Sequence, residues 1–396
     1  MDAKKNAHRN ARKNIVVVGA GYAGLTAALR LDRKQRITLI SAESHFTQRI
    51  RLHELAAGRP EVTVPLSELT KGTGITTVQA RVGGIDLDAR QVRTEDGRVF
   101  PYDTLVYALG SRTDTTAPGV AEHAYTAETA GDLRARLDAG GGDLVVVGGG
   151  LTGVEMAAEL AESYPAWRVA LATGGAVGAG LSDKGRRHLA RTFGRLGVRT
   201  HEWTRVTGVG PDGVRTDQGV ITADVVVWAG SFTVSPLAAE SGLAVDERGR
   251  IVVDETLTSV SHPDVYAVGD AAAVQVQGST NRMSCAAGMP IAAHAADVIN
   301  ARAAGRTPEP FRFRYLLQCI SLGRRDGLVQ LVNGDDSPKD RILSGRTAAF
   351  VKERICRFTV ASLRWERARP GTYMWVKGSA RRTGAEAHRA QTSAAR

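Results

Sequence analysis

The sequence predicts an α/β fold with two parallel-sheet units and a C-terminal extension. Residues 14–31 have the pattern of a buried β-branched strand, a glycine-rich turn and a helix rich in Ala and Leu. The same succession returns from Asp143, about 130 residues further along the chain. A strand, turn and helix of this kind open a Rossmann-like unit, whose turn binds the pyrophosphate of a dinucleotide. One glycine-rich turn is weak evidence, but two of them in this setting predict two Rossmann-like dinucleotide-binding domains.

The first turn has glycine at three positions with separate functions. Gly19 permits the tight turn, Gly21 lets the backbone approach a pyrophosphate, and Gly24 lets the helix and the strand pack closely. The phosphates would lie at the N-terminus of the helix, where free N–H groups and the helix dipole favour negative charge.

The next strand, expected over residues 36–40, ends near the acid that should bind the adenosine ribose. Such an acid is expected about twenty residues after the glycines, and we choose Glu43. Ser41 occupies the more usual register, however, and a solvated loop acid would give the same pattern.

A polar stretch at residues 44–58 contains Arg49 and is expected to cover the cofactor near its ring system. A charged surface helix would have the same composition. Short strands are expected to follow over residues 75–108, and the last of them leads to Gly110.

The second turn repeats the glycine spacing, with Gly148, Gly150 and Gly153. The strand after its helix ends at Thr173, where an NAD-selective site usually has a carboxylate. Without that acid a 2′-phosphate is not repelled, so both NADH and NADPH stay open. Arg186 and Arg187 follow shortly and could reach such a phosphate, although an exposed helix face would explain them equally well.

A later buried strand over residues 265–268 leads into Gly269 and Asp270. An acid in this position can hydrogen-bond a polyol hydroxyl. A helix is expected to begin near Met289 and Pro290, because proline suits the first turn of a helix. Its positive end could point at a flavin pyrimidine.

These motifs, in this order, resemble those of the flavoprotein oxidoreductases with two dinucleotide-binding domains. Within that group the chain looks most like the type II NADH dehydrogenases and the apoptosis-inducing-factor-like reductases, over roughly residues 15–305. The resemblance implies that FAD binds the first turn, including Tyr22 and Ala23, and that NADH or NADPH binds the second and gives a hydride to flavin N5. It also implies that Asp270 holds the ribityl chain. Glu155 is implied to assist proton movement near the two rings, with a helix-surface acid as the alternative.

The resemblance also implies the domain limits. The NAD(P)H-binding domain is expected to be inserted into a discontinuous FAD-binding domain. The expected ranges are 1–14 for a basic disordered tail, 15–120 and 250–310 for the FAD-binding domain, 121–249 for the NAD(P)H-binding domain, 311–370 for a C-terminal region and 371–396 for a disordered tail.

The acceptor of the electrons is less constrained. Cys285, Cys319 and Cys356 are far apart in the sequence and form no CxxC pair, so neither a redox-active disulfide nor a metal site is expected. Residues 285–294 also depart from the quinone motif of the type II dehydrogenases. Three hypotheses follow: two-electron transfer to a quinone or similar small acceptor, reduction or oxidation of a specific small molecule in a biosynthetic pathway, and a redox-responsive scaffold that binds NAD(P)H without turnover.

The net charge of +11 is concentrated near the ends, and residues 301–369 alone contribute net +8. Because residues 15–300 are mildly acidic, we expect no nucleic-acid partner, in spite of the basic total. A basic amphipathic helix is expected over residues 346–366, and its shape suits an anionic membrane surface. The apolar arc of this helix consists of Val351, Ile355, Phe358 and Trp365. Packing of that arc on the protein's own body or on a partner subunit, as in a homodimer, is the alternative.

Neither a signal peptide nor a membrane-spanning segment is expected. The basic, polar N-terminus has no apolar core, and no stretch reaches eighteen apolar residues. The expected location is therefore the cytoplasm, with peripheral binding to the inner face of the cell membrane as an extension of that expectation.

Overall fold

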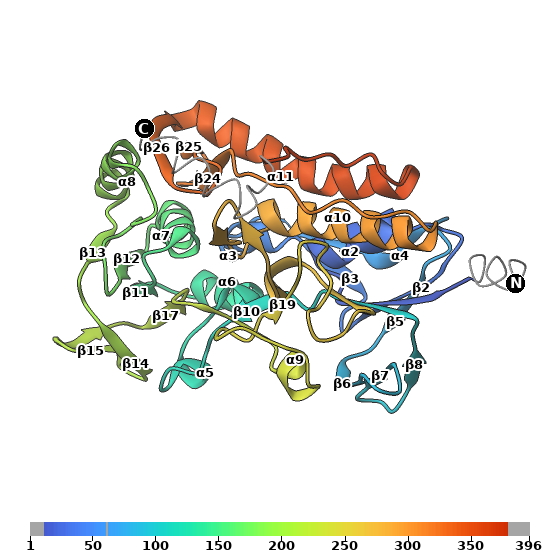
Figure 1. Cartoon of the computed structure of the whole chain (residues 1–396). Coiled ribbons are helices and arrows are strands. Elements are labelled where there is room, and N and C mark those ends of the chain that lie inside the picture. The colour runs from blue at the N-terminus through green and yellow to red at the C-terminus, as the bar shows by residue number, and fades with distance from the viewer. Residues whose placement is uncertain (1–11, 61, 379–396) are drawn as a thin grey trace, which may run out of the picture.

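Two parallel sheets stand side by side, and one long C-terminal helix lies along the top of both (Figure 1). The computed structural model describes residues 12–60 and 62–378. Most of the basic tail expected over residues 1–14, and all residues after Gly378, lie outside the described part of the chain. The predicted α/β fold class with two Rossmann-like units is confirmed.

The first sheet has five parallel strands in the order β20-β9-β1-β2-β5. These are β1 (Asn14–Val18), β2 (Arg36–Ser41), β5 (Thr76–Gln79), β9 (Thr104–Tyr107) and β20 (Val265–Ala267). The four apolar residues of β1 are almost fully buried, as expected for a central parallel strand. Because β1 pairs with β2 on one side and β9 on the other, the loop after β1 opens where the strand order reverses. Ligands of open parallel sheets bind in that crevice.

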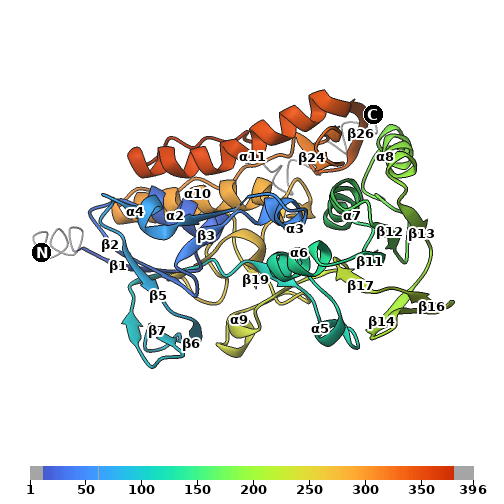
Figure 2. The ribbon, with the colours of Figure 1, turned by 180° about the vertical axis from the view of Figure 1, so that it is seen from behind.

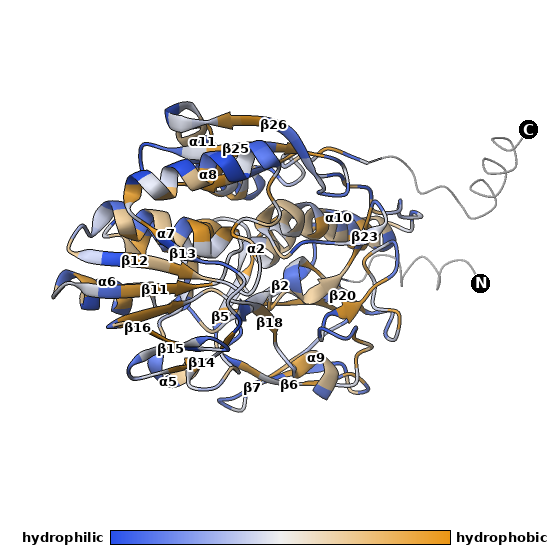
Figure 3. Cartoon of the chain, turned by 90° about the vertical axis from the view of Figure 1, so that its left-hand side faces the viewer, coloured by the Kyte–Doolittle hydropathy of each residue, from blue (hydrophilic) through white to orange (hydrophobic). Residues whose placement is uncertain are grey.

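The second sheet has four parallel strands in the order β13-β12-β11-β17. These are β11 (Gly142–Val147), β12 (Trp167–Ala172), β13 (Arg199–His201) and β17 (Val225–Trp228), with helices α7 (Leu151–Ser163) and α8 (Asp183–Leu196) between them. Strands β11, β12 and β17 are mainly apolar, whereas α8 is mainly hydrophilic (Figure 3). This unit lies in the chain between β9 and β20, so it is inserted into the first. The exact domain limits stay a prediction.

Shorter elements connect and cover the sheets. The pair β10 (Ser111–Thr113) and β18 (Phe232–Val234) links the two crossings between the units. Two three-stranded sheets comprise β6 (Val82–Asp86), β7 (Gln91–Thr94) and β8 (Val99–Pro101), and β14 (Val206–Gly210), β15 (Gly213–Thr216) and β16 (Gly219–Thr222). Small pairs are β3 (His45–Thr47) with β4 (Thr63–Pro65), β19 (Ile251–Val252) with β21 (Ala272–Ala273), and β22 (Gln275–Val276) with β23 (Ser279–Thr280). The short helices are η1 (Arg49–Arg51), α3 (Leu52–Ala56), α4 (Leu66–Thr70), α5 (Val120–His123), η2 (Ala127–Thr129), α6 (Ala130–Asp138), α9 (Leu237–Glu240) and η3 (Gly269–Ala271).

Helices α2 (Tyr22–Arg30) and α10 (Cys285–Ala303) pack against each other beside the first sheet (Figures 1 and 2). Helix α10 begins at Cys285, before the start that the sequence predicted near Met289, so that prediction is wrong. Ser284 is the N-cap, and its carbonyl accepts the N–H of Gly288 at 2.8 Å. The helix is therefore established before Pro290, which lies inside it and costs one intrahelical hydrogen bond.

The C-terminal region contains a sheet that the sequence analysis did not predict. Strands β24 (Leu317–Ser321), β25 (Gly327–Val332) and β26 (Pro338–Ser344) are antiparallel neighbours. Helix α11 (Gly345–Ala368) follows directly, which confirms the helix expected over residues 346–366. In the part of the chain that the structure describes, no helix combines the length and the apolar character needed to cross a bilayer.

The face of α11 that packs on the body differs from the apolar arc expected from periodicity. Its buried residues are Ala348, Lys352, Cys356, Thr359, Val360, Ser362, Leu363 and Glu366, and Val351 and Ile355 are half-buried. Phe358 and Trp365, the other half of the expected arc, are 46% and 49% exposed. The helix is turned this way because two of its charges have partners inside the body, Lys352 with Glu155 and Glu366 with Arg30. Hydropathy periodicity cannot place charged residues on a buried face.

The chain after α11 is also more ordered than expected. Residues 371–378 were expected within a disordered tail, and this expectation is wrong for them, because they pack on the body. The N–H of Tyr373 donates to Glu366 at 2.7 Å, and its carbonyl accepts Arg30 at 2.9 Å. Arg30 in turn binds Asp297 of α10 through two nitrogens. This buried ionic cluster fastens the end of α11 to α2 and α10.

Candidate functional site

The first glycine turn has the close contacts that its spacing predicted. Gly19 has a φ of +102°, and a Cβ there would lie 2.4 Å from the carbonyl oxygen of Ala108. A Cβ on Gly24 would lie 1.8 Å from the carbonyl oxygen of Gly19. By contrast, nothing lies within 4 Å of the position that a Cβ on Gly21 would take. Gly19 and Gly24 therefore serve packing within the protein, whereas Gly21 borders open space that a pyrophosphate can occupy.

Helices α2 and α7 both begin with open N-termini. Gly21 and Gly150 are their N-cap residues, and no side chain caps either helix. The first N–H groups of α2, including those of Tyr22 and Ala23, are thus available to phosphate oxygens. The Tyr22 ring itself packs on Phe46, with the ring centroids 4.9 Å apart. Both turns fit the pyrophosphate of a dinucleotide.

Asp270 joins residues that are far apart in the sequence. The Ser111 hydroxyl donates to Asp270 at 2.7 Å, and Arg49 donates to the Ser111 carbonyl at 2.6 Å. Gly110 and Gly269 take φ values of +66° and +72° in the turns that bring these residues together. Burial raises the pKa of Asp270, so its carboxylate gains from further donors. Hydroxyls of a flavin ribityl chain are donors of that kind, and the cluster therefore fits FAD.

Ala23 and Glu43 are two further residues that were expected to bind FAD, and both lie close to the first glycine turn. A Cβ on Gly269 would lie 2.8 Å from the Cβ of Ala23, so η3 approaches the start of α2 closely. Glu43 is exposed just after β2, and the N–H of Gly19 donates to Ile40 at the end of the same strand. Glu43 thus lies beside the first turn, where an adenosine ribose would extend. The cofactor contacts of these residues stay predictions.

A cavity of about 490 Å³ opens at the carboxyl ends of β11 and β12. Residues 148–150 of the second turn and Thr173 line it. Gly153 lies behind the turn, where a Cβ would be 1.9 Å from the carbonyl oxygen of Gly148. Among the described residues that line this cavity, Arg205 is charged and none is acidic. The cavity fits a pyridine nucleotide and has no carboxylate that would repel a 2′-phosphate.

The cation at this cavity is Arg205, and the suggestion that Arg186 or Arg187 serves the nucleotide is not supported. Arg186 pairs with Asp183 within α8, and neither arginine lines the cavity. Arg205 follows β13, the strand beside β12. The N–H of its neighbour Thr204 donates to the Thr173 carbonyl at 2.9 Å, which holds the two strand ends together. Sequence reasoning missed Arg205 because it did not predict which strand lies next to β12.

Glu155 lies one turn into α7, where α7, β24 and α11 meet. Its Oε1 accepts the N–H of Ser321 at 2.9 Å and pairs with the Lys352 ammonium. Its Oε2 lies 4.0 Å from Nδ1 of His53. Burial alone would lower the pKa of Lys352, but negative charge around it, that of Glu155 first, raises this pKa above its ordinary value. With its side chain 15% exposed, Glu155 is not a surface acid.

Two of the three cysteines flank this pair. Cys319 lies two residues before Ser321 on β24, so the two share a face of the strand. Cys356 lies one turn after Lys352 on α11, so these two share a face of the helix. Ser321 and Lys352 are the residues that bind Glu155. Cys285 is the first residue of α10, and all three are free thiols. Burial raises their pKa values, those of Cys285 and Cys356 to about 12. Thiols of this kind are poor nucleophiles because they stay protonated at neutral pH.

Comparison with known protein families agrees with this geometry. Residues 13–296 match the family described as pyridine nucleotide-disulphide oxidoreductase. An NADH dehydrogenase-like protein of Mycobacterium tuberculosis is 33% identical over 321 residues, which cover 72% of this chain and 80% of that protein. A type II NADH:quinone oxidoreductase of Staphylococcus aureus is 28% identical over 391 residues, covering 87% of this chain and 94% of that protein.

Solved structures share the fold. The sulfide:quinone oxidoreductase of Aquifex aeolicus has a TM-score of 0.75 at 20% identity, over 91% of this chain and 93% of that one. NDH2 of Plasmodium falciparum, solved in complex with NADH, has a TM-score of 0.76 at 16% identity, over 92% of this chain and 99% of that one. The resemblance that the sequence motifs indicated is thereby confirmed.

The two glycines of the first turn should respond differently to substitution. Gly21→Val should give a folded protein that is purified with little flavin, because the side chain would fill the space left for the pyrophosphate. Gly24→Ala should instead prevent stable folding, because its Cβ would overlap the Gly19 carbonyl. Flavin absorbance per polypeptide, with circular dichroism as the test of folding, separates the two. Full flavin content in folded Gly21→Val would contradict the placement of the cofactor.

Proposed function

The chain belongs to the pyridine nucleotide-disulphide oxidoreductase family, whose members bind FAD and NADH, and we propose that it transfers two electrons from NADH or NADPH, through FAD, to a quinone. The observation that carries this proposal is the position of Glu155. Glu155 lies in the second helical turn of α7, just beyond the second glycine-rich turn. Its carboxylate binds both β24 and α11. The relationship to a type II NADH:quinone oxidoreductase along nearly the whole chain supports the same acceptor.

The proposed reaction consumes a proton, since NADH, one proton and a quinone give NAD⁺ and a quinol. FAD and NADH, when bound, would supply the redox chemistry, which is hydride transfer to the flavin and two-electron transfer to the acceptor. The protein holds the two cofactors with its two glycine turns and so fixes their orientation. Glu155 provides a carboxylate for general acid–base work. Lys352 and the N–H of Ser321 fix one oxygen of that carboxylate in place.

We also propose that no thiol takes part in turnover. Although Cys319 and Cys356 approach the same carboxylate, burial keeps their pKa values high, and a protonated thiol does not attack a disulfide. The expectation of a cycle without a redox-active disulfide is thus retained, on different grounds from the sequence spacing that first suggested it.

A second candidate function is reduction or oxidation of a specific small molecule. The observation that favours it is the start of α10, where Cys285 and Pro290 stand in a segment that departs from the quinone motif. This segment lies beside η3 and Asp270, so its side chains help to define the space next to the flavin. A quinone and a smaller acceptor would need different shapes there.

The outer face of α11 provides a membrane-binding surface under this proposal. Phe350, Phe358 and Trp365 are exposed on it by 64%, 46% and 49%, and Arg354 and Arg357 are exposed nearby. Aromatic and basic residues on one helix face suit the interface of an anionic bilayer. We therefore propose peripheral binding to the inner face of the cell membrane, where a lipid-soluble quinone is found. The alternative is that a second copy of the chain covers the same face of α11, as in a homodimer.

Anaerobic NADH or NADPH should bleach the flavin of the purified protein, and a soluble ubiquinone or menaquinone analogue should restore its absorbance. Stopped-flow spectroscopy follows both steps. Bleaching without reoxidation by any quinone would favour the second candidate function. No bleaching by either nucleotide would contradict both. Replacement of all three cysteines by serine should leave bleaching by NADH intact, and its loss in a folded, FAD-loaded variant would reveal a thiol step.

Arg205→Ala should lower kcat/KM for NADPH about tenfold, on the order of 1.4 kcal/mol, because a charge-assisted contact with the 2′-phosphate is lost. The value for NADH should hardly change. Arg186→Ala, which removes an arginine remote from the cavity, is the matched control and should affect neither nucleotide. An equal loss with both nucleotides would contradict this role of Arg205. A wild-type preference for NADH above about a hundredfold, roughly 2.7 kcal/mol, would rule out NADPH as a substrate.

Phe358→Ser combined with Trp365→Ser should abolish co-sedimentation with anionic vesicles at low salt without affecting FAD content. Both residues are exposed, so folding should be unaffected. Trp203→Ser is the control, because Trp203 is 69% exposed on the nucleotide-binding unit and should not contribute to membrane binding. Binding that survives the double substitution, or wild-type protein that never binds vesicles, would defeat the membrane proposal. A change in oligomeric state instead would identify α11 as a subunit interface.

A further inference from the structure

A buried histidine lies between Glu155 and a second acid. The His53 side chain, on α3, is 5% exposed. Its Nδ1 lies 4.0 Å from Oε2 of Glu155, and its Nε2 lies 3.9 Å from Oε1 of Glu54. Nε2 is buried and has no hydrogen-bond partner among the described residues, an uncommon state for a buried polar atom. The imidazole thus has one nitrogen within 4.0 Å of each carboxylate, beyond the distance of a direct hydrogen bond. In the absence of substrate, catalytic hydrogen bonds are often longer than in the working complex.

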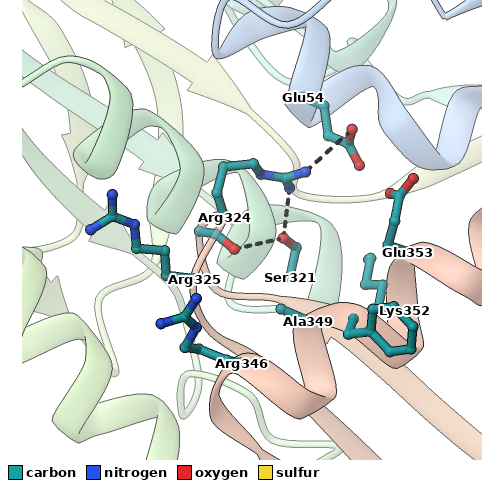
Figure 4. A pocket seen from close by; sticks show the side chains of 10 residues that line it. Glu54, Ser321, Arg324, Arg325, Arg346, Ala349, Lys352 and Glu353 are labelled. Atoms are coloured by element: carbon teal, nitrogen blue, oxygen red, sulfur yellow. Dashed lines mark hydrogen bonds and ion pairs between the residues drawn. The ribbon is translucent and has the colours of Figure 1, made fainter.

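Glu54 connects this histidine to solvent. It borders a cavity of about 350 Å³ between α3, the loop after β24 and the first turns of α11 (Figure 4). Ser321, Arg324 and Lys352 also border the cavity, and the exposed Arg325, Arg346 and Phe350 form its outer part. The Glu54 carboxylate is held by Arg51 at 2.9 Å and by Arg324 at 3.4 Å. A proton from bulk water can therefore reach Glu54 without passing through the cofactor sites.

Burial, together with the positive charges around it, keeps the His53 ring neutral. The charged groups that face it are Glu54 on its own helix, Arg51 on η1, Glu155 on α7, Arg324 after β24 and Lys352 on α11. Burial first, and then the positive charge of Lys352, lower the pKa of His53 well below its ordinary value. A neutral imidazole has one donor nitrogen and one acceptor nitrogen. It can therefore take a proton on one side and release one on the other.

We propose that His53 relays protons from Glu54, at the cavity, to Glu155. A proton bound by Glu54 passes to Nε2 of His53, and the proton on Nδ1 moves to Oε2 of Glu155. One proton enters the ring at Nε2 as another leaves from Nδ1, so the ring stays neutral over the transfer. This inference rests on the proposed function, because only an acceptor that takes up protons requires such a supply. His53 acts indirectly, by delivering the proton to Glu155, and is therefore a positioning residue.

The other neighbours of Glu155 are less suited to this task. Lys352 also borders the cavity, but the raised pKa of its ammonium means that it keeps its proton at neutral pH. The N–H of Ser321 is a backbone amide and does not exchange protons during turnover. Both bind Oε1, so they orient the carboxylate. Oε2, which lies toward His53, is the oxygen at which protons can be exchanged.

His53→Gln tests the relay, because glutamine keeps the size and polarity of the side chain but cannot transfer a proton. Stopped-flow measurements should follow three steps in the FAD-loaded protein: reduction by NADH, reoxidation by a soluble quinone, and reoxidation by ferricyanide, which takes electrons without protons. We expect reoxidation by the quinone to slow at least tenfold, in line with the usual contribution of positioned acid–base groups. Reduction by NADH and reoxidation by ferricyanide should stay at wild-type rates.

Two further readouts distinguish a proton relay from a structural role. In His53→Gln the solvent isotope effect on quinone reoxidation should increase, and added imidazole should restore part of the rate. His188→Gln is the matched control, because the His188 side chain is also largely buried, at 13% exposed, but lies on α8, where its Nε2 is bonded to Asp326 at 2.9 Å. It should leave all three steps unchanged.

Glu54→Gln provides a second variant if His53→Gln does not fold, since an amide oxygen can still accept Arg51. It should give the same selective loss with the quinone. An equal loss with quinone and ferricyanide in both variants, or no loss with the quinone, would overturn the relay. If the wild-type protein is not reoxidised by any quinone, the proposed function fails instead. The two failures are therefore distinguishable.

Discussion

The buried pair of Glu155 and Lys352 is the interaction on which the arrangement of the site depends. Removing one partner of such a pair leaves an uncompensated buried charge and typically costs about 3–5 kcal/mol. Glu155 belongs to the helix after the nucleotide turn, whereas Lys352 belongs to α11. The pair therefore selects one rotation of α11 about its own axis. The N–H of Ser321 binds the same carboxylate, so β24 is held at this junction too.

A second buried ion pair acts at the other end of α11. Glu366 binds Arg30 of α2. Helix α11 is therefore attached near its start to the second unit, through Glu155 of α7, and near its end to the first unit, through Arg30. These two contacts set which residues of α11 remain outside. With Lys352 and Glu366 facing inward, Phe358 and Trp365 must face outward, although both are more apolar than the residues that displaced them. Aromatic residues that such a constraint leaves exposed are suited to an external partner.

The parts of the fold that could be predicted from sequence are those encoded by local patterns. Both glycine turns, their strands and helices, and the position of Asp270 after a buried strand follow from neighbouring residues. Arg205 and Lys352 could not be found in this way, and His53, although it belongs to the polar stretch of residues 44–58, could not be placed beside Glu155. Each becomes part of a site through a contact with a residue far away in the sequence, and Lys352 is 197 positions from Glu155. The sheet of β24, β25 and β26 was missed because its strands mix apolar, polar and glycine residues.

The groups that hold the Glu155 carboxylate in place differ from the group that supplies it with protons. Here an ammonium and a backbone amide bind Oε1, while Oε2 lies toward a neutral imidazole. The same burial that keeps this imidazole neutral also keeps the thiols of Cys319 and Cys356 protonated. Burial thus keeps the thiols unreactive. The neutral histidine can both accept and donate a proton, so it is the group able to exchange protons with Glu155.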